Sequence, residues 1–248
     1  MQHEGVGTHG GPVVTLCITA FNEVESVRQL AQMLREVDAA FPGLIALSIV
    51  DNGSTDGTLE ALDAALPNGR LDTVQRIEPN RGYGGGLGAA IAAAKTAYVC
   101  TLPADGQYPA EAVIQVVRAF VNSGGPDGPA RMVKGRRIAR DDEWLVRAFS
   151  RVYTTSARSV LGLRSRDVNG LPKCFRADRF ISRRDAMPDD FVFDAAILRA
   201  CEVAGDRLLE VAVPFGRRQH GASSWATRRF RVAAGAFAAL FVVRAQIR

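Results

Sequence analysis

The stretch VVTLCITAFNEVESVRQLAQMLREVDAAFPGLIALSIVDNGSTDGT, residues 13–58, holds two apolar, β-rich runs, Val13–Thr19 and Leu44–Val50. Between them, within Glu23–Ala40, apolar residues recur at the spacing of one helix face: Val24, Val27, Leu30, Leu34 and Val37. A strand, a helix and a second strand in this order are typical of a parallel sheet covered by helices. Ligands of such sheets bind beyond the carboxyl ends of the strands, so the loops there are where chemistry is expected.

The same alternation continues along the rest of the chain. In the first half the patterns predict helices at Thr58–Leu66, Gly88–Thr96 and Ala110–Asn122 and strands at Thr73–Ile77 and Tyr98–Leu102. After a turn-rich break at 123–129 they predict a strand, a helix, a strand, a helix and a strand: Arg131–Lys134, Trp144–Leu161, Asp167–Phe175, Phe193–Ala204 and Leu208–Val213. We expect one α/β domain over 13–224, with a mostly parallel sheet flanked by helices, and a basic helical annex over 225–248.

Charge divides the chain into two unlike halves. Residues 1–127 carry 7 Lys+Arg against 14 Asp+Glu, a net charge of −7, whereas residues 128–248 carry 24 against 12, a net charge of +12. Of the 31 basic residues 28 are arginine, whose guanidinium suits bidentate contact with phosphate. The basic half is also the footprint of nucleic-acid-binding proteins, so charge alone leaves the partner open.

Several classes of protein are disfavoured by the composition. The four cysteines are far apart and include no C-x-x-C pair, which disfavours a zinc site and a disulfide framework. The N-terminus lacks the basic and apolar regions of a signal peptide, which predicts a cytosolic protein. The longest nearly uncharged apolar stretch of the chain, residues 232–243, is shorter than the roughly 20 residues that a membrane-spanning helix needs.

Three loops that follow predicted strands carry polar or glycine-rich patterns. In VDNGSTDGT (residues 50–58), Asp51 is placed to accept hydrogen bonds from a nucleoside. In NRGYGGGLG (residues 80–88), glycines allow backbone amides to approach a phosphate. In TLPADGQYP (residues 101–109), Asp105 and Gln107 are oxygen ligands two residues apart, suited to Mg²⁺ or Mn²⁺. Each loop alone also fits an ordinary capped turn.

Together with TAFNE (residues 19–23), these loops resemble the inverting nucleotide-sugar glycosyltransferases of family 2, which have the GT-A fold. The second half narrows the resemblance to polyprenyl-phosphate hexosyltransferases, the group that includes dolichyl-phosphate mannose synthase. The segments that carry it are KGRRIAR from Lys134, DVNGLPKCF from Asp167, DFVFDAAILRA from Asp190, EVAVPF from Glu210 and RQHGASS from Arg218. The chain departs from the family pattern at Asn52 and Pro103, where the family has aspartates.

The resemblance implies a division of labour: residues 13–122 bind the nucleotide sugar and metal, and residues 130–224 bind the acceptor. The nucleotide-sugar residues that it implies are Thr19, Phe21, Glu23, Asp51 and Asp105. Asp105 and Gln107 would hold Mg²⁺ or Mn²⁺, with Asp105 as the catalytic residue. The acceptor phosphate would be surrounded by Arg137, Arg147, Ser150 and Arg218.

The implied activity is transfer of a sugar from UDP- or GDP-hexose to a polyprenyl phosphate, with inversion, and no nucleic-acid partner. We expect a cytoplasmic enzyme, peripheral on the inner face of the membrane. Its segment 225–248 would lie on that surface as a basic amphipathic helix. A membrane-anchored partner or a homo-oligomer would give any firmer attachment.

Two alternatives stay open from the sequence. One is a related transferase that acts on a sugar or a soluble metabolite hydroxyl, with Asp167 or Asp194 as the general base. The other is a catalytically silent nucleotide-sugar binding module, which the departures at Asn52 and Pro103 make conceivable.

Overall fold

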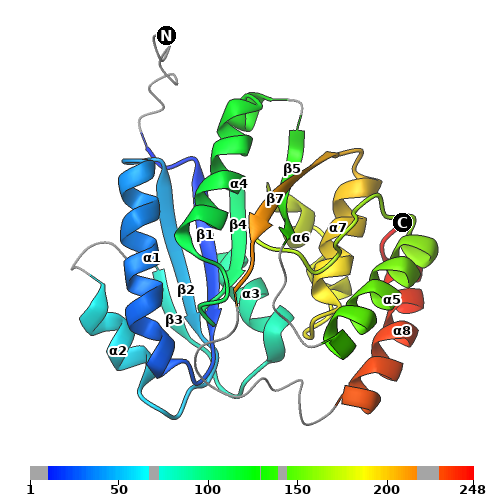
Figure 1. The fold of residues 1–248 in the computed structure, drawn as a ribbon, viewed down its shortest axis with the longest axis horizontal. Helices are drawn as coiled ribbons and strands as arrows, with labels where there is room; N and C mark the ends of the chain where they lie inside the picture. Colours follow the sequence, from blue (N-terminus) through cyan, green and yellow to red (C-terminus); the bar gives the residue numbers. More distant parts are fainter. Residues whose placement is uncertain (1–10, 67–72, 129, 139–143, 217–228) are drawn as a thin grey trace.

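A sheet of seven strands forms the centre of the molecule (Figure 1). The computed structural model describes residues 11–66, 73–128, 130–138, 144–216 and 229–248. The strands are β1 (Val14–Ala20), β2 (Ile45–Asp51), β3 (Thr73–Arg76), β4 (Tyr98–Pro103), β5 (Ala130–Ile138), β6 (Lys173–Arg176) and β7 (Arg207–Pro214). Their order across the sheet is β3-β2-β1-β4-β6-β5-β7. The pairing of β4 with β6 joins the two halves of the chain in one sheet.

Strand direction decides where the functional loops meet. β6 runs antiparallel to its neighbours β4 and β5, and every other pair in this sheet is parallel. Six of the seven strands therefore share one direction, and their carboxyl ends lie along one edge of the sheet. The mostly parallel sheet predicted from the sequence is confirmed.

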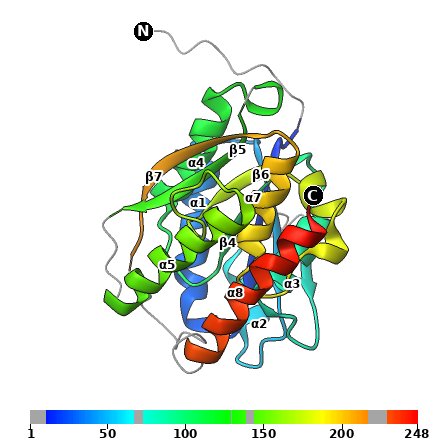
Figure 2. The same cartoon turned by 90° about the vertical axis from the view of Figure 1, so that its right-hand side faces the viewer.

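Helices cover both faces of the sheet, as Figures 1 and 2 show. One apolar cluster contains residues of α1 (Val27–Ala40), α2 (Thr58–Ala65) and α4 (Ala110–Asn122). A second cluster contains residues of the other five helices: α3 (Gly82–Ala93), α5 (Trp144–Leu161), α6 (Asp178–Ile181), α7 (Phe193–Val203) and α8 (Arg229–Gln246). Short 3-10 turns lie at Val24–Ser26, Gly125–Asp127 and Arg184–Ala186.

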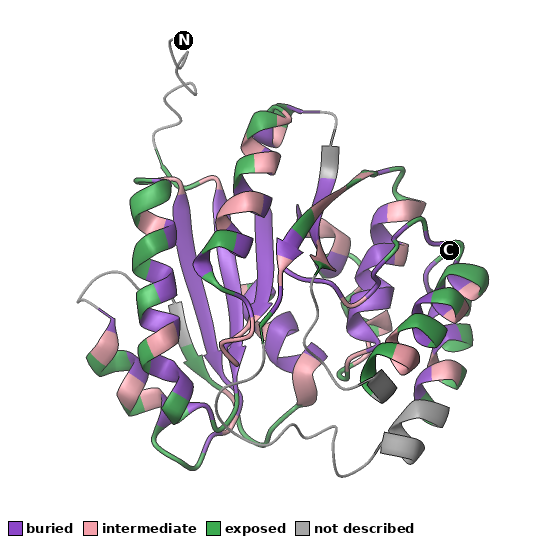
Figure 3. Cartoon of the chain, in the orientation of Figure 1, coloured by how far each residue is buried: buried purple, intermediate pink, exposed green. Residues whose placement is uncertain are grey.

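Burial follows from this two-sided cover. Every residue of β1 and β2 is buried, which fits their near-continuous apolar sequences, and Figure 3 shows the central strands as the buried heart of the fold. The helical apolar stripe predicted after the first strand is confirmed at Val27, Leu30, Leu34 and Val37, which are all buried. Val24 is the exception, because it lies exposed in the 3-10 turn before α1.

The predicted glycine loop is wrong, because these residues form the first turns of a helix. Helix α3 begins at Gly82, six residues before the start predicted at Gly88. A Cβ at Gly84 would collide with Pro188 O and would lie 2.8 Å from Phe193 Cβ, and a Cβ at Gly88 would lie 2.8 Å from Phe180 Cζ. The glycines therefore serve close packing of the helix against neighbouring chain, at a cost in helix propensity.

The strand predicted at Asp167–Phe175 is wrong in its first half. Residues 167–172 instead make a turn, in which Gly170 N–H donates to Asp167 O at 2.9 Å, and β6 begins only at Lys173. This turn crosses close above β5, since a Cβ at Gly135 would collide with Leu171 O. Asp, Asn, Gly and Pro within DVNGLP are the residue types of a turn, and they are the sequence signal for this outcome.

The C-terminal helix α8 packs against α5 and α7. Its residues described as buried, Ala236, Leu240 and Val243, together with Ile247 just after the helix, form one stripe on the protein side, and Arg244 Nη1 donates to Val160 O at 2.7 Å. Phe241 and Val242 lie outside that stripe and are 62% and 53% exposed. Among the helices of the described ranges, none is long and apolar enough to cross a membrane.

Candidate active site

The first two loops at the carboxyl edge are joined to each other by side-chain hydrogen bonds. Asn22, at a positive φ of 53°, accepts the N–H of Thr55 through its Oδ1 and donates its own N–H to Ser54 Oγ, both at 2.9 Å. Glu23 N–H donates to Thr58 Oγ1, also at 2.9 Å. The polar residues of VDNGSTDGT therefore hold TAFNE in place, which a reading of either loop alone does not reveal.

The predicted nucleotide-sugar residues of these loops have different surroundings. Asp51, at the end of β2, is fully buried; its Oδ1 accepts the N–H of Ser54, and its Oδ2 has no hydrogen-bond partner among the described residues, with Arg76 Nε 3.8 Å away. Glu23 is buried and accepts the hydroxyl of Ser26 at 2.9 Å. A buried carboxylate oxygen without a hydrogen bond is costly, so Asp51 is the residue of this group that most needs a ligand.

Thr19 and Phe21 point to unequal roles. Thr19 is buried at the end of β1, and its Oγ1 lies so close to α3 that a Cβ at Gly86 would collide with it. Phe21 is 44% exposed just beyond the strand. Thr19 thus packs the strand against α3, whereas the ring of Phe21 is available on the surface beside the loops.

The side chain of Asn52 forms two hydrogen bonds with the backbone at the start of α3. Its Nδ2 donates to Gly82 O at 2.8 Å, and its Oδ1 accepts the N–H of Arg81 at 3.0 Å. An ionised aspartate has no N–H to donate, so the amide is the side chain that satisfies both backbone groups. This departure from the family pattern has a structural reason.

The loop after β4 carries Asp105 and Gln107, both half-buried. Asp105 Oδ1 accepts the N–H of Gln107 at 3.1 Å, and Gln29 Nε2 of α1 donates to Gly106 O at 3.2 Å. Gln107 Nε2 donates to Gly216 O at 3.4 Å, so its amide oxygen is directed away from that contact. One carboxylate and one amide oxygen within a single turn fit one side of a hard cation such as Mg²⁺ or Mn²⁺.

Other protein ligands for such a cation are few. Within the described ranges, no group of three or more His, Cys, Asp or Glu side chains is arranged to hold a metal. The remaining oxygens would have to come from a ligand such as a diphosphate, as the sequence predicts for this loop.

Two of the four predicted acceptor residues, Arg137 and Ser150, meet at the end of β5. Arg137 forms an ion pair with Asp167 at 2.7 Å, and its Nη2 donates to Ser150 Oγ of α5 at 3.5 Å. Arg147 is exposed on α5, one turn before Ser150. Arg218 lies outside the described residues. The structure thus brings Arg137 and Ser150 together and adds Asp167 to them.

Two aromatic rings connect this acceptor cluster to the loop of Asp105. The guanidinium carbon of Arg137 lies 5.1 Å from the ring centre of Phe215, and the Phe215 ring lies 5.0 Å from that of Tyr108. Gly216 N–H donates to Gln107 O at 3.0 Å. The donor and acceptor halves of the predicted site are therefore in direct contact at one edge of the sheet.

Buried lysines beneath the site are features that sequence reasoning missed. Lys134 is fully buried in β5, and its Nζ donates to Asp167 O at 2.6 Å and to Gly135 O at 2.8 Å. Burial and the charge of Lys173 lower the pKa of Lys134 to about 8. Lys173 Nζ donates to Asp194 Oδ1 at 2.6 Å. A lysine inside an apolar strand run, as in RMVKG and LPKCF, is the sequence signal that could have revealed them.

This network reaches the donor side through Tyr83 of α3. The hydroxyl of Tyr83 donates to Asp194 Oδ2 at 3.3 Å. Burial and then the charge of Asp194 raise its pKa well above the usual value, so the phenol stays protonated. Asp194 thus ties β6 and α3 to the start of α7.

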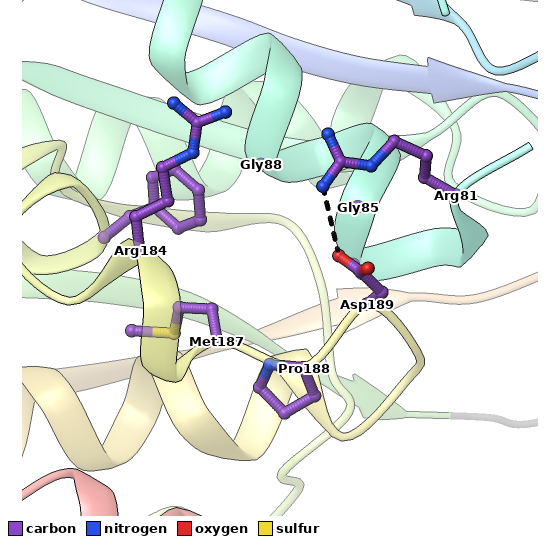
Figure 4. Close-up of a pocket in the computed structure, with 9 residues that line it drawn as sticks. Arg81, Gly85, Gly88, Arg184, Met187, Pro188 and Asp189 are labelled. Carbon is purple, nitrogen blue, oxygen red and sulfur yellow. Dashed lines mark ion pairs between the residues drawn. The ribbon is translucent and has the colours of Figure 1, made fainter. Parts of the chain in front are cut away.

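A small pocket lies beside α3 (Figure 4). Arg81 and Asp189 face each other there as an ion pair at 3.9 Å, and the pocket's volume is about 30 Å³. That space suits about one water molecule, so the pocket is no candidate for a nucleotide.

Comparisons with known proteins identify the family of the chain. The model of the family "Glycosyl transferase family 2" matches residues 15–192. The chain is 28% identical over 217 residues to undecaprenyl-phosphate 4-deoxy-4-formamido-L-arabinose transferase of Aeromonas hydrophila, covering 86% of this chain and 63% of the relative. It is 26% identical over 239 residues to dodecaprenyl-phosphate galacturonate synthase of Rhizobium johnstonii, covering 95% and 68%. The chain thus spans about two thirds of the length of these curated relatives.

The fold also matches solved structures. Glucosyl-3-phosphoglycerate synthase from Mycobacterium tuberculosis, in complex with phosphoglyceric acid, superposes with a TM-score of 0.71 at 16% identity, over 95% of this chain and 81% of that one. A complex of the same synthase with Mg²⁺ and UDP gives a TM-score of 0.69 at 16% identity, over 95% and 80%. The fold class and the family expected from the four loops are confirmed. Because the family model spans most of the chain, the protein belongs to glycosyl transferase family 2.

Proposed function

We propose that the protein transfers a sugar from a nucleotide sugar, a UDP- or GDP-hexose, to a polyprenyl phosphate with inversion. The observation that carries this proposal is the contact of the Asp105–Gln107 loop with the Arg137 cluster through Phe215 and Gly216. The donor has an anionic diphosphate, and the acceptor is also an anion. Transfer between them needs the carboxylate loop, which would hold a cation at the diphosphate, to lie beside the arginine that binds the acceptor. Both curated relatives are named for polyprenyl-phosphate substrates or products, which supports this acceptor.

On this proposal, Asp51 binds the nucleoside with the oxygen that has no hydrogen bond within the described residues, and Glu23 and Thr58 keep the first loop in position. Asp105 and Gln107 would hold Mg²⁺ or Mn²⁺, and such an ion, when bound, neutralises charge on a leaving diphosphate. Asp105 thereby touches the reacting groups and is the catalytic residue of the proposal.

The acceptor needs no strong general base. A phosphate monoester has a second pKa near 6, so its attacking oxygen is already anionic at neutral pH. Arg137 and Ser150 would bind and orient that phosphate, with Arg147 and Arg218 as further contacts. Inversion follows if the phosphate attacks from the face opposite the leaving diphosphate.

The alternative with a soluble hydroxyl acceptor requires a carboxylate ready to accept a proton. The two candidates for that role, Asp167 and Asp194, are engaged by Arg137 and Lys173. Burial raises the pKa of Asp167, but the hydrogen bonds and charge of Arg137 and Lys134 outweigh it and hold this pKa well below the usual range. Such a carboxylate is a weak base, which favours the phosphate acceptor.

The proposal also includes attachment of the protein to the cytoplasmic face of the membrane. Helices α5 and α8 carry exposed apolar side chains, Val146, Val152, Phe241 and Val242. Their sequences contain arginines and no acidic residue. Each basic side chain near an anionic membrane contributes about 1 kcal/mol. Ser150 of the acceptor cluster lies on the same helix α5, four residues after Val146.

The direct test is a transfer assay with purified protein, Mg²⁺ or Mn²⁺, labelled UDP- and GDP-sugars and a polyprenyl phosphate. A labelled lipid product that survives mild base but not mild acid would support the proposal. Transfer to water-soluble sugars alone would overturn the acceptor, and nucleotide binding without transfer or donor hydrolysis would support the catalytically silent binding module.

A further inference from the structure

Asp167 accepts hydrogen bonds along one edge of the Arg137 guanidinium. Arg137 Nε donates to Asp167 Oδ2 at 2.9 Å, and Arg137 Nη2 donates to Asp167 Oδ1 at 2.7 Å. The backbone N–H of Arg137 donates to the same Oδ2 at 3.0 Å. The two side chains are only 9% and 10% exposed. This two-pronged contact fixes the plane of the guanidinium as well as its position.

Asp167 is itself held from below by the fold. Lys134 Nζ and Gly170 N–H both donate to Asp167 O, at 2.6 and 2.9 Å. A Cβ at Gly170 would lie 2.7 Å from Asp167 Oδ2 and would collide with Gly135 O. The aspartate therefore cannot shift without moving β5 or the turn that crosses it.

Two further contacts direct the guanidinium toward the acceptor cluster. One of its faces lies over Phe215, and its Nη2 reaches Ser150 Oγ on α5. With one edge on Asp167, one face on Phe215 and Nη2 at Ser150, the guanidinium is held in one orientation beside α5. From the sequence, Asp167 is a candidate general base, whereas its contacts are those of a residue that keeps Arg137 in position.

We propose that Asp167 is a positioning residue that presents Arg137 in one orientation to an anionic acceptor, a phosphate monoester. This inference rests on the proposed function, because Arg137 is taken to contact the acceptor phosphate. Without Asp167, the arginine would sample several rotamers, and binding of a phosphate would carry the entropic cost of ordering its side chain. Asp167 acts on acceptor binding and leaves donor binding to the loops of Asp51 and Asp105.

The test compares Asp167→Asn with Asp206→Asn in the full chain. Asp206 forms the same two-pronged pair with Arg179, at 2.6 and 2.8 Å, in the part of the fold where α6 lies beside the turn after α7. Asp206 is therefore a matched control for the general effect of breaking a largely buried arginine pair. Asp167→Glu is a second variant, which keeps the charge but moves the carboxylate by one methylene.

The measurements are calorimetric binding of farnesyl phosphate, a short polyprenyl phosphate, and KM values for donor and acceptor. We expect Asp167→Asn to raise the acceptor KM and the farnesyl phosphate Kd at least tenfold, with the donor KM changed less than twofold. Asp167→Glu should give a smaller increase, and Asp206→Asn should leave both KM values unchanged while lowering Tm.

The outcomes separate the two proposals. Unchanged or tighter farnesyl phosphate binding in a folded Asp167→Asn or Asp167→Glu variant, with wild-type transfer intact, would overturn the positioning role alone. An equal rise in donor and acceptor KM would also overturn it, since general loosening does that. Wild-type protein that neither binds nor glycosylates a polyprenyl phosphate would overturn the proposed function itself.

Discussion

Lys173 and Asp194 form an ion pair at 2.6 Å inside the protein, with their side chains 1% and 5% exposed. The pair joins the first residue of β6 to the first turn of α7 beneath the candidate site. Burial lowers the pKa of Lys173, and the attraction of Asp194 opposes that shift. Two buried charges that satisfy each other are tolerated, but either one alone is costly.

Asp194→Leu should therefore destabilise the protein by about 3–5 kcal/mol, because it leaves the Lys173 ammonium buried without its partner. The double variant Lys173→Met/Asp194→Leu should recover most of that loss. Denaturant unfolding of the wild type, both single variants and the double variant measures the coupling. Additive losses would contradict a direct charge pairing.

Gly84→Ala should destabilise the fold by about 1–3 kcal/mol, the usual cost of overpacking. The new Cβ would collide with Pro188 O, a backbone atom that cannot rotate away. Gly235→Ala in α8 is the control, because its Cβ would meet nothing within 4 Å. That change should stabilise the helix by up to about 1 kcal/mol. Opposite signs in urea unfolding check the prediction.

The contribution of Asp167 to stability should disappear in acid. A carboxylate whose pKa is depressed in the folded state stabilises the protein above its unfolded pKa, which is near 4, and loses that effect as pH falls further. The Tm difference between wild type and Asp167→Asn should therefore be constant from about pH 5 to 8 and should narrow below about pH 4. A difference that grows in acid would contradict the ion pair.

Asp105→Asn should remove the metal dependence of nucleotide binding. In thermal-shift measurements, UDP or GDP should stabilise the wild type more with Mn²⁺ than without it. The variant should keep the nucleotide effect of Asp51 and lose the increment due to Mn²⁺, with sugar transfer reduced by at least 100-fold, the order reported for lost electrostatic stabilisation. Asp63→Asn, at an exposed position of α2, is the control. An unchanged Mn²⁺ increment in Asp105→Asn would reject the metal role.

Phe241→Ser/Val242→Ser should weaken binding to vesicles that contain anionic lipid. Where burial is described in α8, at residues 235–246, these two side chains are the most exposed large apolar groups, and burying each fully in the membrane interface is worth about 1.5–3 kcal/mol. Ile181→Ser on α6, which removes an apolar side chain that is 55% exposed, is the matched control. Equal loss in both variants, or none in either, in a vesicle sedimentation assay would contradict a membrane contact through α8.

Much of the fold is readable from local patterns. Helices α4 and α5 have the bounds that the sequence predicts, because their apolar positions repeat at 3.6 residues and turn residues flank α4. The two errors have different causes. The glycines around Gly84 have the local pattern of a loop, but they serve close packing against distant chain such as Pro188. At 167–172 the turn residues of DVNGLP are a local signal, which the strand prediction overlooked.

The candidate site divides in the same way. The order of polar loops after strands predicts Asp51 and Asp105 as site residues, since parallel strands bring their carboxyl ends to one edge, whereas the family resemblance is what implies Arg137. The sequence does not show that Asn52 must donate and accept at the start of α3. Nor does it show that Arg137 is held by a residue 30 positions away.

By itself, the sequence determined the α/β class and the family and predicted the edge of the sheet where the chemistry is expected, because these follow from periodicity and from the order of loops. Only the tertiary structure decided which carboxylate oxygens accept hydrogen bonds and which do not. Asp51 keeps a buried oxygen without a hydrogen bond within the described residues, whereas Asp167 and Asp194 are bound to Arg137 and Lys173. Electrostatic interactions depend on the distance between two charges and on their burial. Neither the distance nor the burial is set by position along the chain.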